Sequence, residues 1–218
     1  MPFLPTPPLN SVNNYHQNKM NVFGDQSSQI DFYTESPSRN GAKVAILLEE
    51  LGLNFDLRLL HTLLILAHRL PYRLHKVDTA NNAHQEPWFL AVNPNGRLPA
   101  LTDIHSDGSR VRLFEPGSIM QYLIDTYDTD HRISYPKGSP EAIEVSNWLF
   151  FHHTGVGPNH GEWEHFSQNA PEKIPYSIDR FRNETLRLYL VVEKHLCEAK
   201  TDYLVGNKWC VSSNNVSH

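Results

Sequence analysis

Residues 36–41, SPSRNG, separate a stretch that alternates apolar and polar residues from a stretch with apolar residues at helical spacing. The alternation covers residues 30–33 and predicts a strand, whereas residues 43–53 predict a helix. A loop at this place leaves unpaired backbone N–H groups at the helix start, and such a start favours an anion. The stretch therefore predicts an anion-binding corner or, as the plainer interpretation, a simple connection between strand and helix.

A second group of residues able to do chemistry lies further along the chain, where histidines and glutamates gather: His152, His153, His160, His165, Glu162 and Glu164. Their spacing does not match the closely paired ligands of a zinc motif, so no metal is expected. No Ser-His-Asp constellation, P-loop or dinucleotide fingerprint is evident, which leaves hydrolase, kinase and dehydrogenase functions without support. Cys197 and Cys210 lack a CxxC partner and are expected to be ordinary residues in a reducing compartment.

The helix predicted after the polar loop has one apolar face and is a candidate core helix. Glu49 and Glu50 are left for solvent, and Gly52 is the expected helix stop. The residues of the apolar face are Val44, Ile46, Leu47, Leu48 and Leu51.

The segments after this helix alternate between the residue patterns of strands and those of helices. Strands are expected at residues 72–77 and 111–114, and residues 87–92 form a short helical or irregular segment before the turn Asn93-Pro94-Asn95-Gly96. With a helix at residues 117–127 the order becomes β-α-β-α-β-β-α, which predicts one sheet covered by helices.

The second half of the chain is expected to be helical. Residues 142–151 and 177–196 carry the helical patterns, and Pro171 and Pro175 are start signals for the second of them. The fold class is therefore α/β followed by all-α, with residues 129–140 as the linker between the two parts.

Length and charge limit the function classes. A chain of 218 residues supports two small domains, and a net charge of −5 with a pI near 6.2 gives no attraction to nucleic acid or anionic membranes. No apolar run reaches the roughly 18 residues of a transmembrane segment, and no signal sequence is evident, so a cytoplasmic protein is expected. Residues 1–28, rich in Pro, Asn, Ser and Gln, are expected to be a disordered arm.

Several stretches resemble fungal glutathione S-transferases of the branch that includes the yeast nitrogen-catabolite regulator. The matching stretches lie between residues 29 and 208: RNGAKVAILLEELGL, HQEPWFLAVNPNGRLPAL, LFEPGSIMQYLIDTYD, APEKIPYSIDRFRNETLRLY and DYLVGNK. The resemblance implies a thioredoxin-like domain that holds glutathione at residues 29–128. It also implies a helical domain at residues 141–208 that shapes the pocket for a second substrate.

The resemblance implies an enzyme that conjugates the glutathione thiolate to an electrophilic small molecule such as a toxin or fungal metabolite. Related members reduce peroxides or disulfides with glutathione, and the sequence does not separate these reactions. Glutathione is the expected co-substrate, no metal is expected, and a homodimer is implied. The alternatives are a non-catalytic regulator that uses the fold as a partner surface, or a defective product of an altered transcript.

The resemblance assigns the catalytic position to Asn40, which stands where other branches have Tyr or Ser. An Asn amide and a helix N-terminus both donate hydrogen bonds to a thiolate, the nucleophilic form of a thiol. The alternative is that Asn40 merely caps the helix.

The resemblance places glutathione on His84, Arg97, Leu98, Pro99, Glu115 and Pro116. His84 matches a contact to the glycyl end, Leu98-Pro99 matches a cis-proline site, and Glu115 matches the acid that binds the γ-glutamyl amino group. Relatives place Ser after this Glu, whereas Pro116 has neither an N–H nor a hydroxyl for the γ-glutamyl carboxylate. The second-substrate pocket is expected on Phe151, His153, Asn159, His160 and Trp163.

The sequence also departs from these relatives in two larger segments. Residues 57–71, LRLLHTLLILAHRLP, are inserted where relatives pass directly into the second strand, either as a partner- or membrane-surface element or as a gene-model error. Residues 209–218 differ from relatives, which continue into a buried helix, so the helical domain is expected to be incomplete and its long helices to expose apolar surface.

Overall fold

The computed structural model describes residues 30–36, 38–52, 72–105, 107–199 and 201–212. The predicted disordered arm, residues 1–28, and the inserted segment, residues 57–71, both lie outside the described residues.

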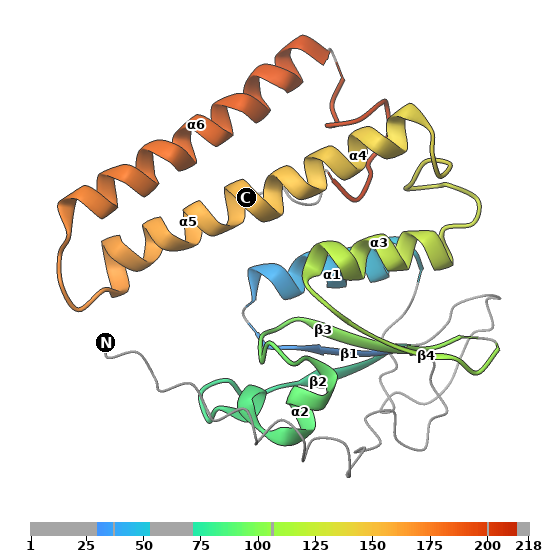
Figure 1. Ribbon diagram of the computed structural model, residues 1–218. Helices are drawn as coiled ribbons and strands as arrows, with labels where there is room; N and C mark the ends of the chain where they lie inside the picture. Colours follow the sequence, from blue (N-terminus) through green and yellow to red (C-terminus); the bar gives the residue numbers. More distant parts are fainter. Residues whose placement is uncertain (1–29, 37, 53–71, 106, 200, 213–218) are drawn as a thin grey trace, which may run out of the picture.

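The first half is a four-stranded sheet with helices on both faces. Its elements follow the predicted order: β1 (Ile30–Thr34), α1 (Arg39–Glu50), β2 (Tyr72–Lys76), η2 (Ala83–Gln85), α2 (Pro87–Val92), β3 (Ala100–Ile104), β4 (Arg110–Phe114) and α3 (Pro116–Tyr127). The strand order is β2-β1-β3-β4, with β1 parallel to β2 and the other pairs antiparallel. Helices α1 and α3 cover one face and α2 covers the other (Figure 1).

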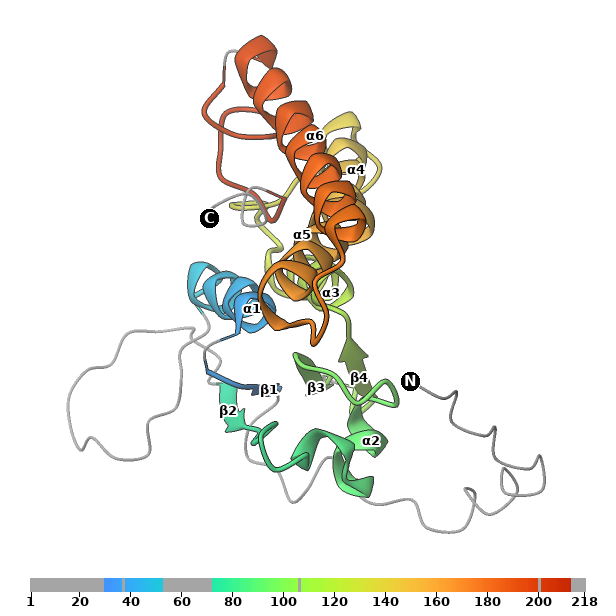
Figure 2. The same ribbon diagram turned by 90° about the vertical axis from the view of Figure 1, so that its left-hand side faces the viewer.

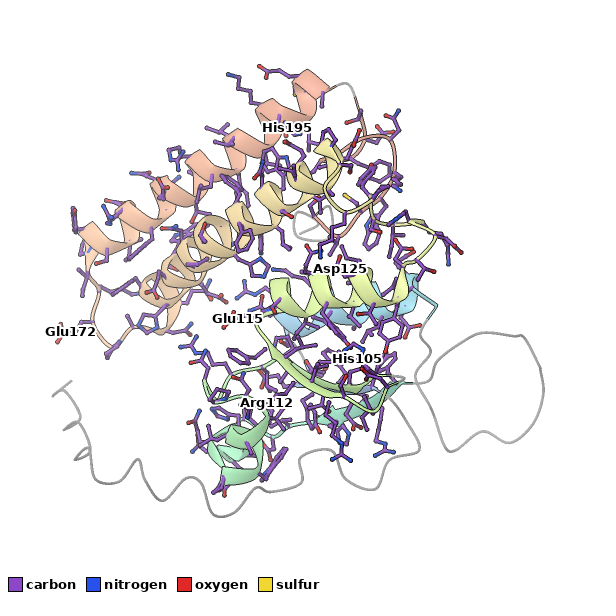
Figure 3. The ribbon with its side chains drawn as sticks, turned by 45° about the vertical axis from the view of Figure 1, so that its right-hand side comes forward. His105, Arg112, Glu115, Asp125, Glu172 and His195 are labelled. Atoms are coloured by element: carbon purple, nitrogen blue, oxygen red, sulfur yellow. The ribbon has the colours of Figure 1, made fainter. Side chains whose placement is uncertain are left out.

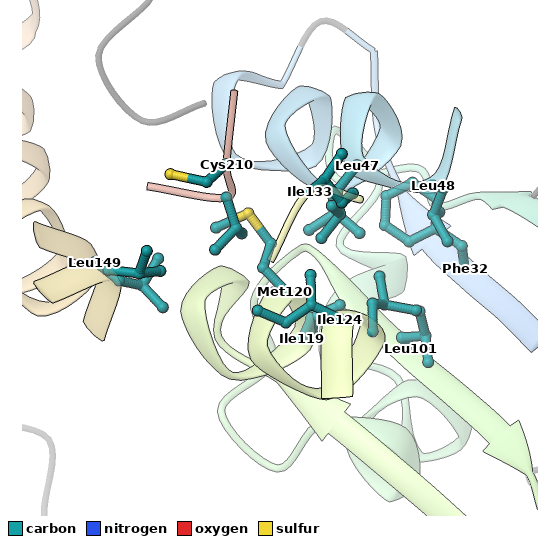
Figure 4. Packing of buried hydrophobic residues seen from close by; sticks show 14 of the residues in the cluster. Phe32, Leu47, Leu48, Leu101, Ile119, Met120, Ile124, Ile133, Leu149 and Cys210 are labelled. Atoms are coloured by element: carbon teal, nitrogen blue, oxygen red, sulfur yellow. The ribbon is translucent and has the colours of Figure 1, made fainter. Parts of the chain in front are cut away.

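The main core lies between the sheet and the α1–α3 layer. Ile30 and Phe32 of β1 belong to it, whereas Tyr33 belongs to a smaller cluster with Phe89 of α2. Both faces of β1 are therefore buried, as a central strand requires. Figure 4 shows how side chains of α1 and α3 meet over the sheet in this cluster.

Helix α1 begins earlier than its apolar pattern predicts, and Ile46 is not on its buried face. Ser38 is the N-cap, and its hydroxyl accepts a hydrogen bond from the Gly41 N–H at 3.1 Å. The interpretation of Asn40 as the cap is therefore wrong. Ile46 is 43% exposed, because the side that packs on the sheet carries Val44, Leu47 and Leu48 at spacings of three and four, and position 46 points away.

Replacing Ser38 with alanine is expected to lower the free energy of unfolding by about 1 kcal/mol, because the N–H of Gly41 loses its partner at the helix start. Urea denaturation followed by circular dichroism measures this loss. Ser118→Ala, at an exposed position of α3, is the matched control and is expected to change stability much less. Equal losses in the two variants would contradict the capping role.

The second half is one long bent helix followed by a second long helix. The bent helix comprises α4 (Pro140–Phe151), η3 (His152–Val156), α5 (Gly157–Glu164) and η4 (His165–Asn169), and the connecting residues keep helical dihedral angles. The segments η3 and η4 are wide π turns, which occur in helices at functional sites. Helix α6 (Pro175–Ala199) runs back along the bent helix, as Figures 1 and 2 show.

Exposed apolar side chains do occur on the long helices, as expected. Phe150 of α4 is 68% exposed and Leu190 of α6 is 67% exposed. In the described part of residues 209–218, Cys210 and Val211 are buried within the main core. These two residues therefore pack into the core that both halves share. No helix among the described residues is long and apolar enough to cross a membrane.

Candidate active site

Two adjoining cavities lie where the sheet half meets the bent helix. The larger has a volume of about 590 Å³ and is lined by α1, the start of α3, the bent helix and Tyr189 of α6. The smaller has a volume of about 300 Å³ and is lined by α1, the loop before β3 and the start of α3. Both volumes fall in or near the range of small-molecule sites. The residues shared by the two cavities are Asn40, Arg97, Glu115 and Pro116.

The first turn and a half of α1 contribute one polar and one charged side chain to the place where the two cavities meet. Asn40 is exposed at the helix start, and Lys43 lies one turn further on with its Nζ 3.4 Å from the Asn40 Oδ1. The same Nζ lies 2.5 Å from the Nε2 of His152 in the π turn η3. Burial, and secondarily the charge of Arg39, lower the pKa of Lys43 to about 8.

The loop before β3 forms one wall of the smaller cavity. The Leu98–Pro99 peptide bond is cis, as the resemblance implies. Asn93 fixes this loop, because its Nδ2 donates to the Arg97 carbonyl at 2.6 Å and its Oδ1 accepts from the Asn95 N–H at 2.9 Å. Asn93 and Asn95 line the cavity although the sequence indicated only a turn there.

The junction of β4 and α3 supplies a carboxylate and a proline. Glu115 has a φ of 69°, in a region that non-glycine residues adopt at a cost of order 1–3 kcal/mol. It precedes the helix without capping it by its side chain, and the carboxylate is exposed toward the cavities (Figure 3). Pro116 is buried as the first residue of α3, where the missing N–H costs the helix nothing.

The bent helix contributes imidazoles to the larger cavity. His153 Nδ1 donates to the Leu149 carbonyl at 2.8 Å, and its buried Nε2 has no hydrogen-bond partner among the described residues. Burial chiefly lowers the pKa of His153, and the positive charge of Lys43 adds to this effect. His160 Nδ1 lies 2.8 Å from the hydroxyl of Tyr189, which ties the bent helix to α6.

Four predicted site residues lie outside the lining of both cavities. His84 is half-buried in η2, and its Nδ1 has no hydrogen-bond partner in the described structure. Phe151 packs against the main core, Asn159 donates to the Gly155 carbonyl, and Trp163 contacts the ring of His160. The larger cavity is instead lined by Lys43 and His152, for which the sequence predicted no role in binding.

An ion pair lies beside the larger cavity, since Arg39 is one of its lining residues. Arg39 at the start of α1 donates to the carboxylate of Glu164 at the end of α5. The contact joins the sheet half to the helical half. Among the described residues, no group of three histidine, cysteine or acidic side chains is arranged to hold a metal ion.

The mixed sheet, the cis-proline beside the cavity and the packed helical half define a thioredoxin-like fold of the transferase type. Comparison with known proteins gives the family. A family model described as "Glutathione S-transferase, N-terminal domain" matches residues 60–126. The glutathione S-transferase-like protein gedE of Aspergillus terreus is 37% identical over 78% of this chain and 68% of its own length. The chain belongs to the glutathione S-transferase family.

Solved structures agree with this assignment. A glutathione transferase homolog from Lodderomyces elongisporus, solved with two glutathione molecules per subunit, is 36% identical with a TM-score of 0.74. The match covers 87% of this chain and 81% of that one. The nitrogen regulation fragment of the yeast prion protein Ure2p is 28% identical with a TM-score of 0.74, covering 88% of this chain and 82% of that one. Both a transferase homolog and a regulator are therefore similar to this protein.

Proposed function

We propose that this protein binds glutathione in the smaller cavity and transfers its thiolate to an electrophilic small molecule held in the larger cavity. The observation that carries the proposal is the position of Asn40, which lines both cavities at the N-terminus of α1. A thiol held there would face both a hydrogen-bond donor and the second substrate. In the transfer, the thiolate sulfur forms a bond to the electrophilic carbon as the leaving group departs with its electron pair.

The local chemistry is sufficient to ionise the thiol at neutral pH. An ordinary thiol has a pKa of about 8.5, and lowering it by two units requires roughly 2.7 kcal/mol of preference for the thiolate. A helix N-terminus contributes about 0.3–2 kcal/mol, and a hydrogen bond to a charged group contributes about 1.5–3 kcal/mol. Asn40 and the start of α1 together supply this preference.

The charged groups of the smaller cavity suit the ends of a tripeptide. The Glu115 carboxylate pairs with the γ-glutamyl amino group in the proposed binding mode, and the Arg97 guanidinium is available to a carboxylate. Pro116 gives the γ-glutamyl carboxylate no donor, which weakens glutathione binding. Glutathione is thus a co-substrate, and no metal takes part in the proposal.

Two measurements test the proposal. Calorimetry with glutathione is expected to show binding with a dissociation constant in the micromolar to low-millimolar range. Transfer to 1-chloro-2,4-dinitrobenzene, followed by absorbance, is expected to exceed the rate without protein. Absence of glutathione binding to the folded chain would overturn the proposal.

A second candidate is a non-catalytic regulatory protein, and the observation that favours it is Pro116 at the start of α3. A site that lacks a donor for one carboxylate binds glutathione less tightly, which a protein that uses the fold as a partner surface tolerates. Glutathione binding without turnover toward haloarenes, peroxides or disulfides would select this candidate. Both proposed functions include a homodimer and a cytoplasmic location. The molecular mass in solution, measured by light scattering, tests the homodimer.

A further inference from the structure

Lys43 is a buried amine on the wall of the larger cavity. The residue is 5% exposed although lysine is rarely buried without a partner. Its Nζ lies between the Asn40 amide of the same helix and the His152 imidazole of the bent helix. The proposed catalytic amide is therefore in contact with a cation of its own helix that also contacts the bent helix.

The chemistry of an ammonium group fixes the orientation of its neighbours. An ammonium only donates hydrogen bonds, so the Asn40 atom beside it is the acceptor Oδ1, at 3.4 Å. The amide Nδ2 is then turned away from Lys43. Asn40 also lines the smaller cavity, which Lys43 does not line.

The partner on the bent helix completes this arrangement. His152 is buried, and its Nε2 lies 2.5 Å from the Lys43 Nζ. Since the ammonium is the donor, this Nε2 is the acceptor and the proton of the neutral imidazole is on Nδ1. His152 thereby holds the lysine side chain across the boundary between the two halves of the protein.

We propose that Lys43 is a positioning residue for glutathione transfer, which holds the Asn40 amide so that its N–H groups face the glutathione sulfur. The inference rests on the proposed function, because it assigns a role toward the same thiolate. The positive charge of Lys43 also favours the thiolate over the thiol, since an opposite charge within about 4–6 Å lowers the pKa of an acid.

The charge of Lys43 gives the site a dependence on pH. The other titratable or charged groups that line this cavity come from α1, the loop before β3, the residue before α3, the bent helix and α6: Arg39, Arg97, Glu115, His152, His153, His160, Glu162, His165 and Tyr189. The pKa of Lys43 is lowered to about 8, so the ammonium is present below this pH and is lost above it. The stabilisation of the thiolate therefore weakens as the pH rises through about 8.

The test measures the pKa of bound glutathione from thiolate absorbance near 240 nm, together with the pH profile of kcat/KM. Lys43→Met keeps the length and removes the charge, and it is expected to raise the thiol pKa by about one unit or more. Lys43→Arg keeps a cation, so it is expected to retain most of the lowered thiol pKa. Lys194→Met, at an exposed position of α6, is the matched control.

A double-mutant cycle separates positioning from charge alone. In a chain that carries Asn40→Ala, the effect of Lys43→Met on the thiol pKa is expected to be smaller than in the native chain. Equal effects in the two backgrounds would overturn the positioning role. Calorimetry of the native chain distinguishes failure of the proposed function from failure of the role proposed for Lys43. If the native chain does not bind glutathione, both proposals are overturned. If it binds glutathione and Lys43→Met leaves the thiol pKa unchanged, only the role of Lys43 is overturned. If Lys43→Met does not fold, Lys43→Gln takes its place in the same measurements.

Discussion

Asn40→Ala is expected to lower kcat/KM for glutathione transfer by about 10- to 100-fold at neutral pH. The variant removes a hydrogen bond to a charged sulfur, worth about 1.5–3 kcal/mol, from the junction of the two cavities. Alanine is a better helix former than asparagine, so the first turn of α1 is expected to stay folded. Initial rates with 1-chloro-2,4-dinitrobenzene at saturating and limiting glutathione measure the loss.

The same substitution at Asn159 is the matched control for this prediction. Asn159 lies outside the lining of both cavities, and its side chain donates within the bent helix to the Gly155 carbonyl. Asn159→Ala is therefore expected to leave kcat/KM within about twofold of the native chain. Unchanged turnover after Asn40→Ala would remove Asn40 from the catalytic role and, with it, the observation that carries the proposed function.

Pro116→Ser is expected to tighten glutathione binding by about tenfold to a hundredfold. The first residue of α3 would then present an N–H and a hydroxyl to the γ-glutamyl carboxylate in the proposed binding mode, and hydrogen bonds to a charged group contribute about 1.5–3 kcal/mol. The helix start tolerates both residues, although loss of the proline ring costs about 0.4–1 kcal/mol of stability. Calorimetric titration with glutathione gives the dissociation constants of the native chain and of the Pro116→Ser variant.

Pro158→Ser is the matched control for the binding prediction. Pro158 lines only the larger cavity, near the start of α5, and it also lacks a backbone N–H. Its replacement is expected to leave glutathione affinity unchanged while it alters the site proposed for the electrophile. An equal gain in both variants, or no gain in Pro116→Ser, would show that the carboxylate does not bind at the start of α3.

Local sequence patterns determined the order of elements in the first half and the class of the fold. Strand alternation, helical spacing and turn residues act over a few neighbouring positions, so β1, α3 and the turn at residues 93–96 could be predicted without tertiary contacts. The resemblance placed the cis bond at Leu98–Pro99 and brought Asn40, Arg97, Glu115 and Pro116 to one site. These residues lie in the first turn of α1, in the loop before β3 and at the start of α3.

Only the tertiary structure decided which side chains meet across the two halves. Lys43 and His152 are 109 positions apart, and no local pattern predicts that their nitrogen atoms approach each other. The packing of the bent helix also left Phe151, Asn159 and Trp163 outside both cavities, whereas His153 and His160 line the larger one. A residue's type and spacing determine the element that carries it, whereas the packing of that element against the rest of the chain determines which cavity it reaches.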